Sequence, residues 1–496
     1  MKMKTITLLF MFCIFNLNAQ ITYIPDNGFE QALIDMGYDT APLDDQIATE
    51  AITNITNLDL HDADITNLTG IEDFTKLEVL DISDNQILAV DLSKNTALKT
   101  LDCSINGLME LDISVNSEMT MLKCSNNQLT ELSTAENGML RYIDCSANQI
   151  SSIELVGNPN LEVLMISDNL IEEVDLIGNQ QLQVLHIAKN QLRDLRIEEH
   201  QELRDLIASG NILTSIDLTQ NPILDRIDLD FNHIGEIDLT NNQIVRRLHL
   251  AENELHEISL IENTLVQYIG IAGNHISYAD LEKNTLLQVL EAQDNQLSAI
   301  NISDNLELEY LDISINVVTS LVLDKNTNLE TLVISNNLLE ELDLRTNNML
   351  NTLSAVAIPT LSCITVANVD VAMSNENWVK DEAIMYSNTC GATSIANTFL
   401  EDLEAASLLT DGNVGRLDKG INFYPNPVKD NIYIESDKAI KKVIIYSTLG
   451  RKVLEVKKGS NTISTSALPE GVYIIKIESE EGYIINKMLK TNRVDK

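Results

Sequence analysis

The feature that most constrains this chain is an apolar pattern that recurs every 21 residues. It starts at Leu77 and repeats through thirteen equal steps to Leu350, without one insertion. Within each unit, positions 4, 6, 11, 14 and 16 are apolar, and positions 9 and 19 carry asparagine. Such a unit cannot bury its apolar face alone, so successive units must stack into a solenoid.

The two asparagine positions predict how that solenoid is held together. Position 9 is asparagine in thirteen units, from Asn85 to Asn337, and position 19 is asparagine in twelve units and His200 in the other. A buried amide offers two donors and an acceptor to backbone groups that no strand partner reaches. We therefore expect stacked amides to bond successive turns. The alternation at positions 3 to 7 predicts a short strand, paired in parallel, with positions 4 and 6 inward.

The motif LxxLxLxxN at positions 1 to 9, repeated in a shorter form at positions 11 to 19, resembles the nested 21-residue leucine-rich repeats of bacterial surface proteins, sometimes called the IRREKO type. The resemblance covers residues 55 to about 370 and implies a mainly parallel β solenoid over residues 55–362.

Upstream, Asp26 and Gly37 enclose apolar residues at helical spacing, which predicts a capped helix in an N-terminal cap, residues 20–54.

The N-terminus has the layout of a secretory signal peptide, residues 1–19. Lys2 and Lys4 precede an apolar run that ends in a polar stretch at Ala19. That run is too short to span a bilayer, and no later stretch approaches the ~18 apolar residues needed. We expect cleavage after Ala19 and no transmembrane segment.

The cysteines fall into two groups. Cys103, Cys124 and Cys145 share inward position 6 of consecutive repeats, which favours core packing, with metal binding or disulfide chemistry as the alternative. Cys363 and Cys390 lie outside the register. In an oxidising compartment that pair predicts a disulfide that closes a C-terminal cap, residues 363–390.

The C-terminal part breaks the repeat. We expect a linker at residues 391–420, with a short helix around residues 399–409, and then a small β-sandwich at residues 421–496. Five segments there alternate as strands do: residues 431–436, 442–447, 451–456, 472–477 and 483–489.

The same region resembles the C-terminal sorting domain of type IX secretion. The resemblance rests on Tyr424-Pro425-Asn426-Pro427, on the segment from Leu449 to Val453 around Gly450, on the segment from Leu468 to Tyr473 around Gly471, and on the segment from Lys487 to Lys490. It implies that the type IX machinery recognises residues 421–496 and exports the protein through the periplasm to the outer cell surface or the medium.

Charge and motif content exclude several classes of function. The formal net charge of −42 repels phosphate backbones, so nucleic acid is not an expected partner. Neither a phosphate-binding loop nor a nucleophile elbow nor a paired CxxC motif is present. The sequence therefore indicates no cofactor, no metal site and no catalytic residue, and an enzyme is a remote alternative.

A row of carboxylates marks outward position 15. It comprises Asp91, Asp112, Glu154, Asp175, Asp217, Asp238, Asp280 and Asp343. Like charges stacked about 5 Å apart repel one another, and divalent cations could relieve this. No loop of the DxDxDG type supplies the ligands that calcium needs, so we expect a solvated acidic face.

A candidate partner-binding patch departs from the serine and aspartate that most repeats place at outward positions 3, 5 and 7. It comprises Tyr142, Val163, Met165, Val184, His186, Ile207, Arg226, Arg247, His249 and Tyr268. Exposed apolar groups beside arginines suggest a contact surface. The alternative is that cross-strand packing and an Asp205 to Arg226 pair simply stabilise the sheet.

These patterns predict a secreted or cell-surface protein that binds a protein or glycan partner through its solenoid face, in adhesion or recognition. A structural or calcium-modulated surface component is the alternative.

Overall fold

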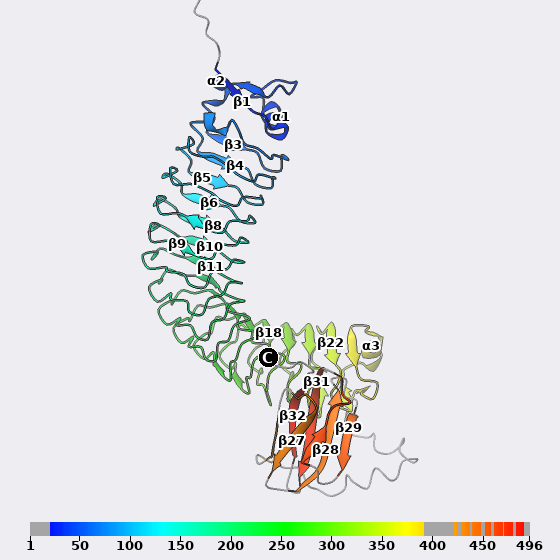
Figure 1. The fold of residues 1–496 in the computed structure, drawn as a ribbon. Coiled ribbons are helices and arrows are strands. Elements are labelled where there is room, and N and C mark those ends of the chain that lie inside the picture. Colours follow the sequence, from blue (N-terminus) through cyan, green and yellow to red (C-terminus); the bar gives the residue numbers. More distant parts are fainter. Residues whose placement is uncertain are drawn as a thin grey trace, which may run out of the picture. The chain divides into compact units, whose positions relative to one another are not determined.

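The computed structural model describes residues 20–390 and most of residues 421–490, leaving out 425–427, 437–438, 448–451, 458–460, 470 and 480–482. The predicted signal peptide and the predicted linker, with its helix, lie outside the described residues. The chain divides into two compact units, Met1–Leu192 and Arg193–Lys496. Each unit is described by itself, as is the C-terminal domain (Figure 1).

A short helix opens the described chain where the sequence predicts one. Helix α1 spans Asn27–Asp35, and the Asp26 carboxylate accepts a hydrogen bond from the backbone N–H of Phe29 at 3.0 Å. The same carboxylate accepts the N–H of Thr66 at 2.9 Å. Phe29 is fully buried, and its ring lies 6.0 Å from that of Phe74. The helix therefore covers the apolar end of the first repeats.

The N-terminal part of the chain also contains two short strands, a second α-helix and a 3-10 helix. Strand β1 (Ile21–Tyr23) pairs antiparallel with β2 (Gln46–Ala48), and α2 (Thr49–Ile52) and the 3-10 helix η1 (Ile71–Asp73) follow.

Parallel strands of three or four residues form the main sheet of each unit (Figure 1). In the first unit they are β3 (Asn57–Asp59), β4 (Val79–Asp81), β5 (Thr100–Asp102), β6 (Met121–Lys123), β8 (Tyr142–Asp144), β10 (Val163–Met165) and β11 (Val184–His186). In the second they are β12 (Asp205–Ile207), β13 (Arg226–Asp228), β14 (Arg247–His249), β16 (Tyr268–Gly270), β18 (Val289–Glu291), β19 (Tyr310–Asp312), β20 (Thr331–Val333), β22 (Thr352–Ala355) and β24 (Trp378–Lys380). Most neighbours pair at a 21-residue offset, as Val79 does with Thr100.

A second set of short strands, of two or three residues, follows the main strands of some repeats. They are β7 (Leu132–Ser133) with β9 (Ile153–Glu154), β15 (Ile258–Ser259) with β17 (Ala279–Asp280), and β21 (Leu342–Asp343) with β23 (Cys363–Thr365) and β25 (Met385–Ser387). Helix α3 (Val369–Ser374) lies between β23 and β24. Parallel pairing thus continues through residues 363–390, the segment expected to cap the solenoid.

The main strands are shorter than the sequence suggested, because they cover positions 3 to 5 rather than 3 to 7. Position 8 turns the chain with a positive φ, 54° at Asp84 and 55° at Ile105, for example. Side chains other than glycine rarely adopt this conformation, yet it recurs at position 8 in nearly every repeat. One residue further on, the asparagine bonds the carbonyls of positions 6 and 7, as Asn85 does with Ile82 and Ser83.

The asparagines of position 9 form a continuous row, which we call the position-9 row. The Nδ2 of Asn127 donates to the carbonyls of Cys103, Cys124 and Ser125 at 3.0 to 3.3 Å. Its Oδ1 accepts the N–H of Leu108 at 2.9 Å. Cys103 and Leu108 belong to the preceding repeat, so one buried amide ties two turns together, as predicted.

The asparagines of position 19, which we call the position-19 row, bond differently. The Nδ2 of Asn242 donates to the carbonyls of Leu218 and Asn221 at 3.1 and 2.9 Å. Its Oδ1 is buried and has no hydrogen-bond partner among the described residues, as in most of this row. At Asn158 the hydroxyl of Thr134 supplies the missing donor at 2.7 Å. This row therefore acts mainly as a set of donors.

The C-terminal domain consists of two antiparallel sheets. One contains β26 (Ile421–Tyr424), β27 (Asn431–Ser436) and β30 (Thr462–Ser464), and the other β28 (Ile440–Ser447), β29 (Lys452–Lys457), β31 (Gly471–Ser479) and β32 (Tyr483–Lys490). Ile432, Ile445 and Ile475, from both sheets, lie in one buried apolar cluster. The predicted small β-sandwich is confirmed, and its five predicted strands are present with β26 and β30 in addition.

Candidate interaction surface

The outward face of the main sheet presents side chains from positions 3 and 5 of each repeat. In most strands the central residue is buried and the two flanking residues are half-buried, as in β10 and β13. Because parallel neighbours pair in register, the flanking side chains form rows that cross the strands. The candidate patch belongs to these rows, five residues in each unit.

In the first unit, the candidate residues pack against one another. Tyr142 pairs with Val163, and Val163 pairs with Val184 on the next strand. The hydroxyl of Tyr142 lies 3.4 Å from the sulfur of Met165, which pairs with His186. All five are half-buried, so the expectation of strongly exposed apolar groups is wrong here. Their burial favours the alternative, cross-strand packing that stabilises the sheet.

In the second unit, charged and aromatic side chains replace the apolar ones. In the strand register, Ile207 lies opposite Asp228, and Asp205 lies opposite Arg226. Arg226 stands directly opposite Arg247, and Arg247 stands opposite Tyr268. The His249 ring stacks on the Tyr268 ring with centroids 4.3 Å apart. We call Arg226, Arg247, His249 and Tyr268 the arginine strip.

The two arginines of the strip are unequally neutralised. Arg226 lies 3.7 Å from Asp228, its side chain is 28% exposed, and its Nε has no hydrogen-bond partner among the described residues. Arg247 is exposed, and no carboxylate of the described residues pairs with it. Its sequence neighbour Arg246, in contrast, forms an ion pair with Asp225 at 2.8 Å. The strip therefore leaves a guanidinium available beside a second, partly buried one.

Several residues of this site were missed from the sequence. The hydroxyl of Tyr268 donates to Glu291, across Gly270. A β-carbon at Gly270 would lie 3.2 Å from the Tyr268 ring, so the glycine makes room for this contact. Asp230 accepts the N–H of Ala251 at 2.6 Å. Gly270 and Glu291 also depart from the serine and aspartate common at position 5. Including position 5 of these two repeats in the candidate patch would have identified both residues.

Burial controls the protonation of two groups here. Burial raises the pKa of Asp230 to about 7, against the effect of its hydrogen bond from Ala251, and the nearby carboxylates raise it further. Burial also lowers the pKa of His249; Asp228 opposes this shift, whereas Arg226 lowers the pKa further. His249 is therefore neutral at pH 7, and the positive charge of the strip comes from its arginines.

The carboxylate row of position 15 is engaged by its own turns. Each of its seven aspartates accepts the backbone N–H two residues later, as Asp238 does from Thr240 at 2.9 Å. Hydrogen bonds from Thr240 hold the pKa of Asp238 below its usual value. These residues shape the turn. Among the described residues, no group of three or more histidine, cysteine, aspartate or glutamate side chains could hold a metal ion.

The cysteines behave as predicted. Cys103, Cys124 and Cys145 are free thiols buried in the core, and burial raises their pKa strongly. Buried thiols of high pKa are poor nucleophiles, so these three cysteines serve to pack the core. Cys363 and Cys390 are joined by a disulfide with a Cα separation of 5.8 Å.

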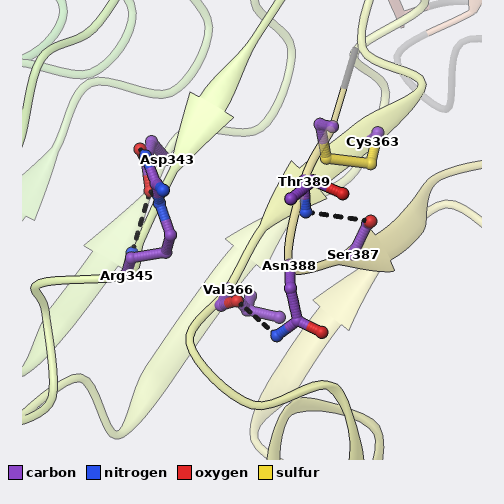
Figure 2. The surroundings of a disulfide bond; sticks show 8 residues. Asp343, Arg345, Cys363, Val366, Ser387, Asn388 and Thr389 are labelled. Atoms are coloured by element: carbon purple, nitrogen blue, oxygen red, sulfur yellow. Dashed lines mark hydrogen bonds and ion pairs between the residues drawn. A yellow bond between two sulfur atoms is a disulfide. The ribbon is translucent and has the colours of Figure 1, made fainter. Parts of the chain in front are cut away.

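A pocket of about 940 Å³ lies beside this disulfide. Figure 2 shows Asp343 and Arg345 facing each other near the cysteine pair, with Arg345 Nε 3.0 Å from Asp343 Oδ1. The pocket is also lined by Leu323, Glu340 and Cys390.

Comparison with solved structures identifies the fold of the repeats. The functional domain of InlJ from Listeria monocytogenes, which includes a cysteine ladder, is similar with a TM-score of 0.68 and 22% identity, over 95% of this chain and 99% of that one. An internalin of the same organism, InlF, has a TM-score of 0.59 and 21% identity, over 62% and 94%. The leucine-rich-repeat ectodomain of the Arabidopsis receptor kinase HAESA, solved with a peptide hormone ligand, has a TM-score of 0.57 and 19% identity, over 68% and 64%.

Sequence comparison identifies the C-terminal domain. Residues 422–491 match the family described as a secretion system C-terminal sorting domain. Of its motif residues, Tyr424 and Gly471 are described, in β26 and β31, whereas Pro425, Asn426, Pro427 and Gly450 lie outside the described residues. No curated protein sequence matches the chain. In its described part, none of the helices is long and apolar enough to cross a membrane. The protein is thus a leucine-rich-repeat solenoid that ends in a type IX secretion sorting domain, which marks it for export to the cell surface or the medium.

Proposed function

We propose that the exported protein is a recognition module that binds a protein or glycan partner through the outward face of its main sheet, in adhesion or recognition. One observation carries this proposal. The arginine strip puts two arginines at position 3, where other repeats hold mostly valine, threonine or tyrosine. It leaves Arg247 exposed and without an ion pair among the described residues. The HAESA ectodomain, a similar solenoid, was solved with a peptide ligand, which supports a role of this kind.

The alternative of a calcium-modulated surface component has less support. It rested on the carboxylates of position 15, but the seven aspartates of that row are bonded to their own turns. Those bonds explain why aspartate recurs there without any cation. We therefore do not develop this alternative.

We also propose the division of the chain that the sequence predicts. It comprises a signal peptide (1–19), an N-terminal cap (20–54), the solenoid (55–362), a disulfide-closed cap (363–390), a linker (391–420) and the sorting domain (421–496). Deletion of residues 421–496 should trap the protein in the periplasm of the host bacterium. Cell fractionation tests this, and normal surface display of the truncated chain would contradict it.

Site-specific photo-crosslinking tests the binding proposal. A benzophenone side chain would replace Ile207 on the outward face or, as a control, Tyr278, which is 66% exposed and directly precedes β17 of the same unit. The full chain carrying either probe would be irradiated with surface proteins and glycans of the host. We expect an adduct from position 207 and none from position 278. Adducts from both positions equally, or from position 278 alone, would place the contact elsewhere.

A further inference from the structure

We propose that the arginine strip is a carboxylate-binding site whose ligand is an acidic side chain within an otherwise neutral peptide segment of the partner. This inference rests on the proposed function and narrows it to one class of partner. The two guanidinium groups of Arg226 and Arg247 would share the carboxylate.

The pairing of like charges is the first argument. Arg226 and Arg247 are directly opposed on adjacent parallel strands, where like charges destabilise a sheet. An ion pair with Asp228 at 3.7 Å relieves part of the charge on Arg226, and nothing among the described residues relieves that on Arg247. A bound carboxylate would satisfy the exposed N–H groups of both guanidinium groups.

The immobility of the surrounding side chains is the second argument. The Tyr268 ring is held by stacking on His249 and by its hydrogen bond to Glu291. The strip therefore has a preformed wall beside Arg247, so that binding orders few side chains. Because the ring faces are partly covered by this stacking, they offer a sugar ring less surface than they offer a peptide edge.

The surrounding negative charge decides the kind of anion. Asp228 and Glu291 lie around the strip, and the chain as a whole carries a net charge of −42. These carboxylates would repel the many charges of a polyanion. For a single carboxylate, the attraction of the two arginines outweighs that repulsion. At physiological salt the Debye length of about 8 Å limits the repulsion from more distant carboxylates. A peptide with one or two acidic residues in a neutral sequence fits best.

Binding of a defined peptide to the purified full chain tests this. The probe is an acetylated, amidated and fluorescently labelled peptide with two glutamates flanked by glycine and serine, and its two-glutamine counterpart is the ligand control. Trigalacturonate provides a carboxylate on a glycan. We expect the glutamate peptide to bind, the glutamine peptide to bind at least about tenfold more weakly, and added salt to weaken the binding.

Arg246 offers a matched control variant one residue away. Arg247→Glu should weaken binding of the glutamate peptide at least about tenfold, whereas Arg246→Glu makes the same charge change beside the strip and should change it less than about threefold. Equal losses would mean that only the general field of the protein matters, and the site would be wrong. Binding of trigalacturonate with no binding of the glutamate peptide would overturn the peptide as ligand.

The two proposals fail in different ways. If position 207 captures a partner whose binding Arg247→Glu leaves unchanged, the carboxylate site is wrong and the recognition face stands. If the glutamate peptide binds as expected but position 207 captures nothing, the anion site stands and the proposed function is wrong.

Discussion

Polar side chains inside the solenoid and polar side chains of the arginine strip are used in opposite ways. Asn127, in the position-9 row, makes four hydrogen bonds to the backbone of two repeats. Arg247, in the strip, is exposed and forms no ion pair with any described residue. The residues that recur every 21 positions are those that the backbone needs. For the arginine strip, which interrupts the repeat on the outward face, we propose recognition instead.

Replacing an asparagine of the position-9 row should have the largest effect. Asn127→Ala leaves the carbonyls of Cys103, Cys124 and Ser125 and the N–H of Leu108 without this partner. We expect the free energy of unfolding to fall by about 3 to 5 kcal/mol in urea titrations. Gln128→Ala, at the exposed neighbouring position, is the control and should change it by less than about 0.5 kcal/mol. A loss below about 1 kcal/mol for Asn127→Ala would contradict the role of this row.

The position-19 row should be less sensitive. Asn242→Ala removes two donated hydrogen bonds but no accepted one, because its Oδ1 has no partner among the described residues. We expect a loss of about 1 to 3 kcal/mol in the same assay. A loss equal to that of Asn127→Ala would mean that the Oδ1 of Asn242 accepts a hydrogen bond as well, for instance from buried water.

Asp230 shares features with both the inward asparagines and the arginine strip. It lies on the outward face, as the strip does, but it accepts a backbone N–H. Its pKa is raised from 3.8 to about 7, so the folded state holds its proton between these values while the unfolded state releases it. Stability therefore falls as pH rises from 4 to 7, and the penalty is complete above pH 7. Asp230→Asn should stabilise the protein at pH 8 by about 1 to 2 kcal/mol, allowing for solvent screening, and not at pH 4. Thermal melts across this range measure it; equal stabilisation at both pH values would contradict the shift.

The sequence predicted the parts of the molecule that repeat. The 21-residue spacing, the inward amides and the buried thiols all follow from residues whose environment is copied in neighbouring turns. The disulfide was predicted on a different ground, from two cysteines outside the register. It did not predict the left-handed turn at position 8, because Asp84 and Ile105 share no chemistry that signals it. It also missed the turn bonds of the position-15 aspartates, although four of the seven are followed two residues later by serine or threonine, which is a usable signal.

The site was harder to predict than the fold. Half-burial of Tyr142 and Met165 depends on the side chains of neighbouring strands, which the periodicity does not specify. The contact between Tyr268 and Glu291 crosses a repeat and depends on the absence of a side chain at Gly270. Such features belong to one place in the array, and a repeat pattern describes only what is common to all places.

One pair of truncations tests the central claim that structural and recognition residues are separate. Asp238→Ala removes a turn bond, and Arg247→Ala removes the exposed guanidinium; each variant is measured for Tm and for affinity to the two-glutamate peptide. Asp238→Ala should lower Tm by about 1 to 2 °C and leave affinity within about twofold. Arg247→Ala should leave Tm within about 1 °C and weaken affinity at least about fivefold. Loss of affinity in Asp238→Ala alone, or loss of Tm without loss of affinity in Arg247→Ala, would contradict the account.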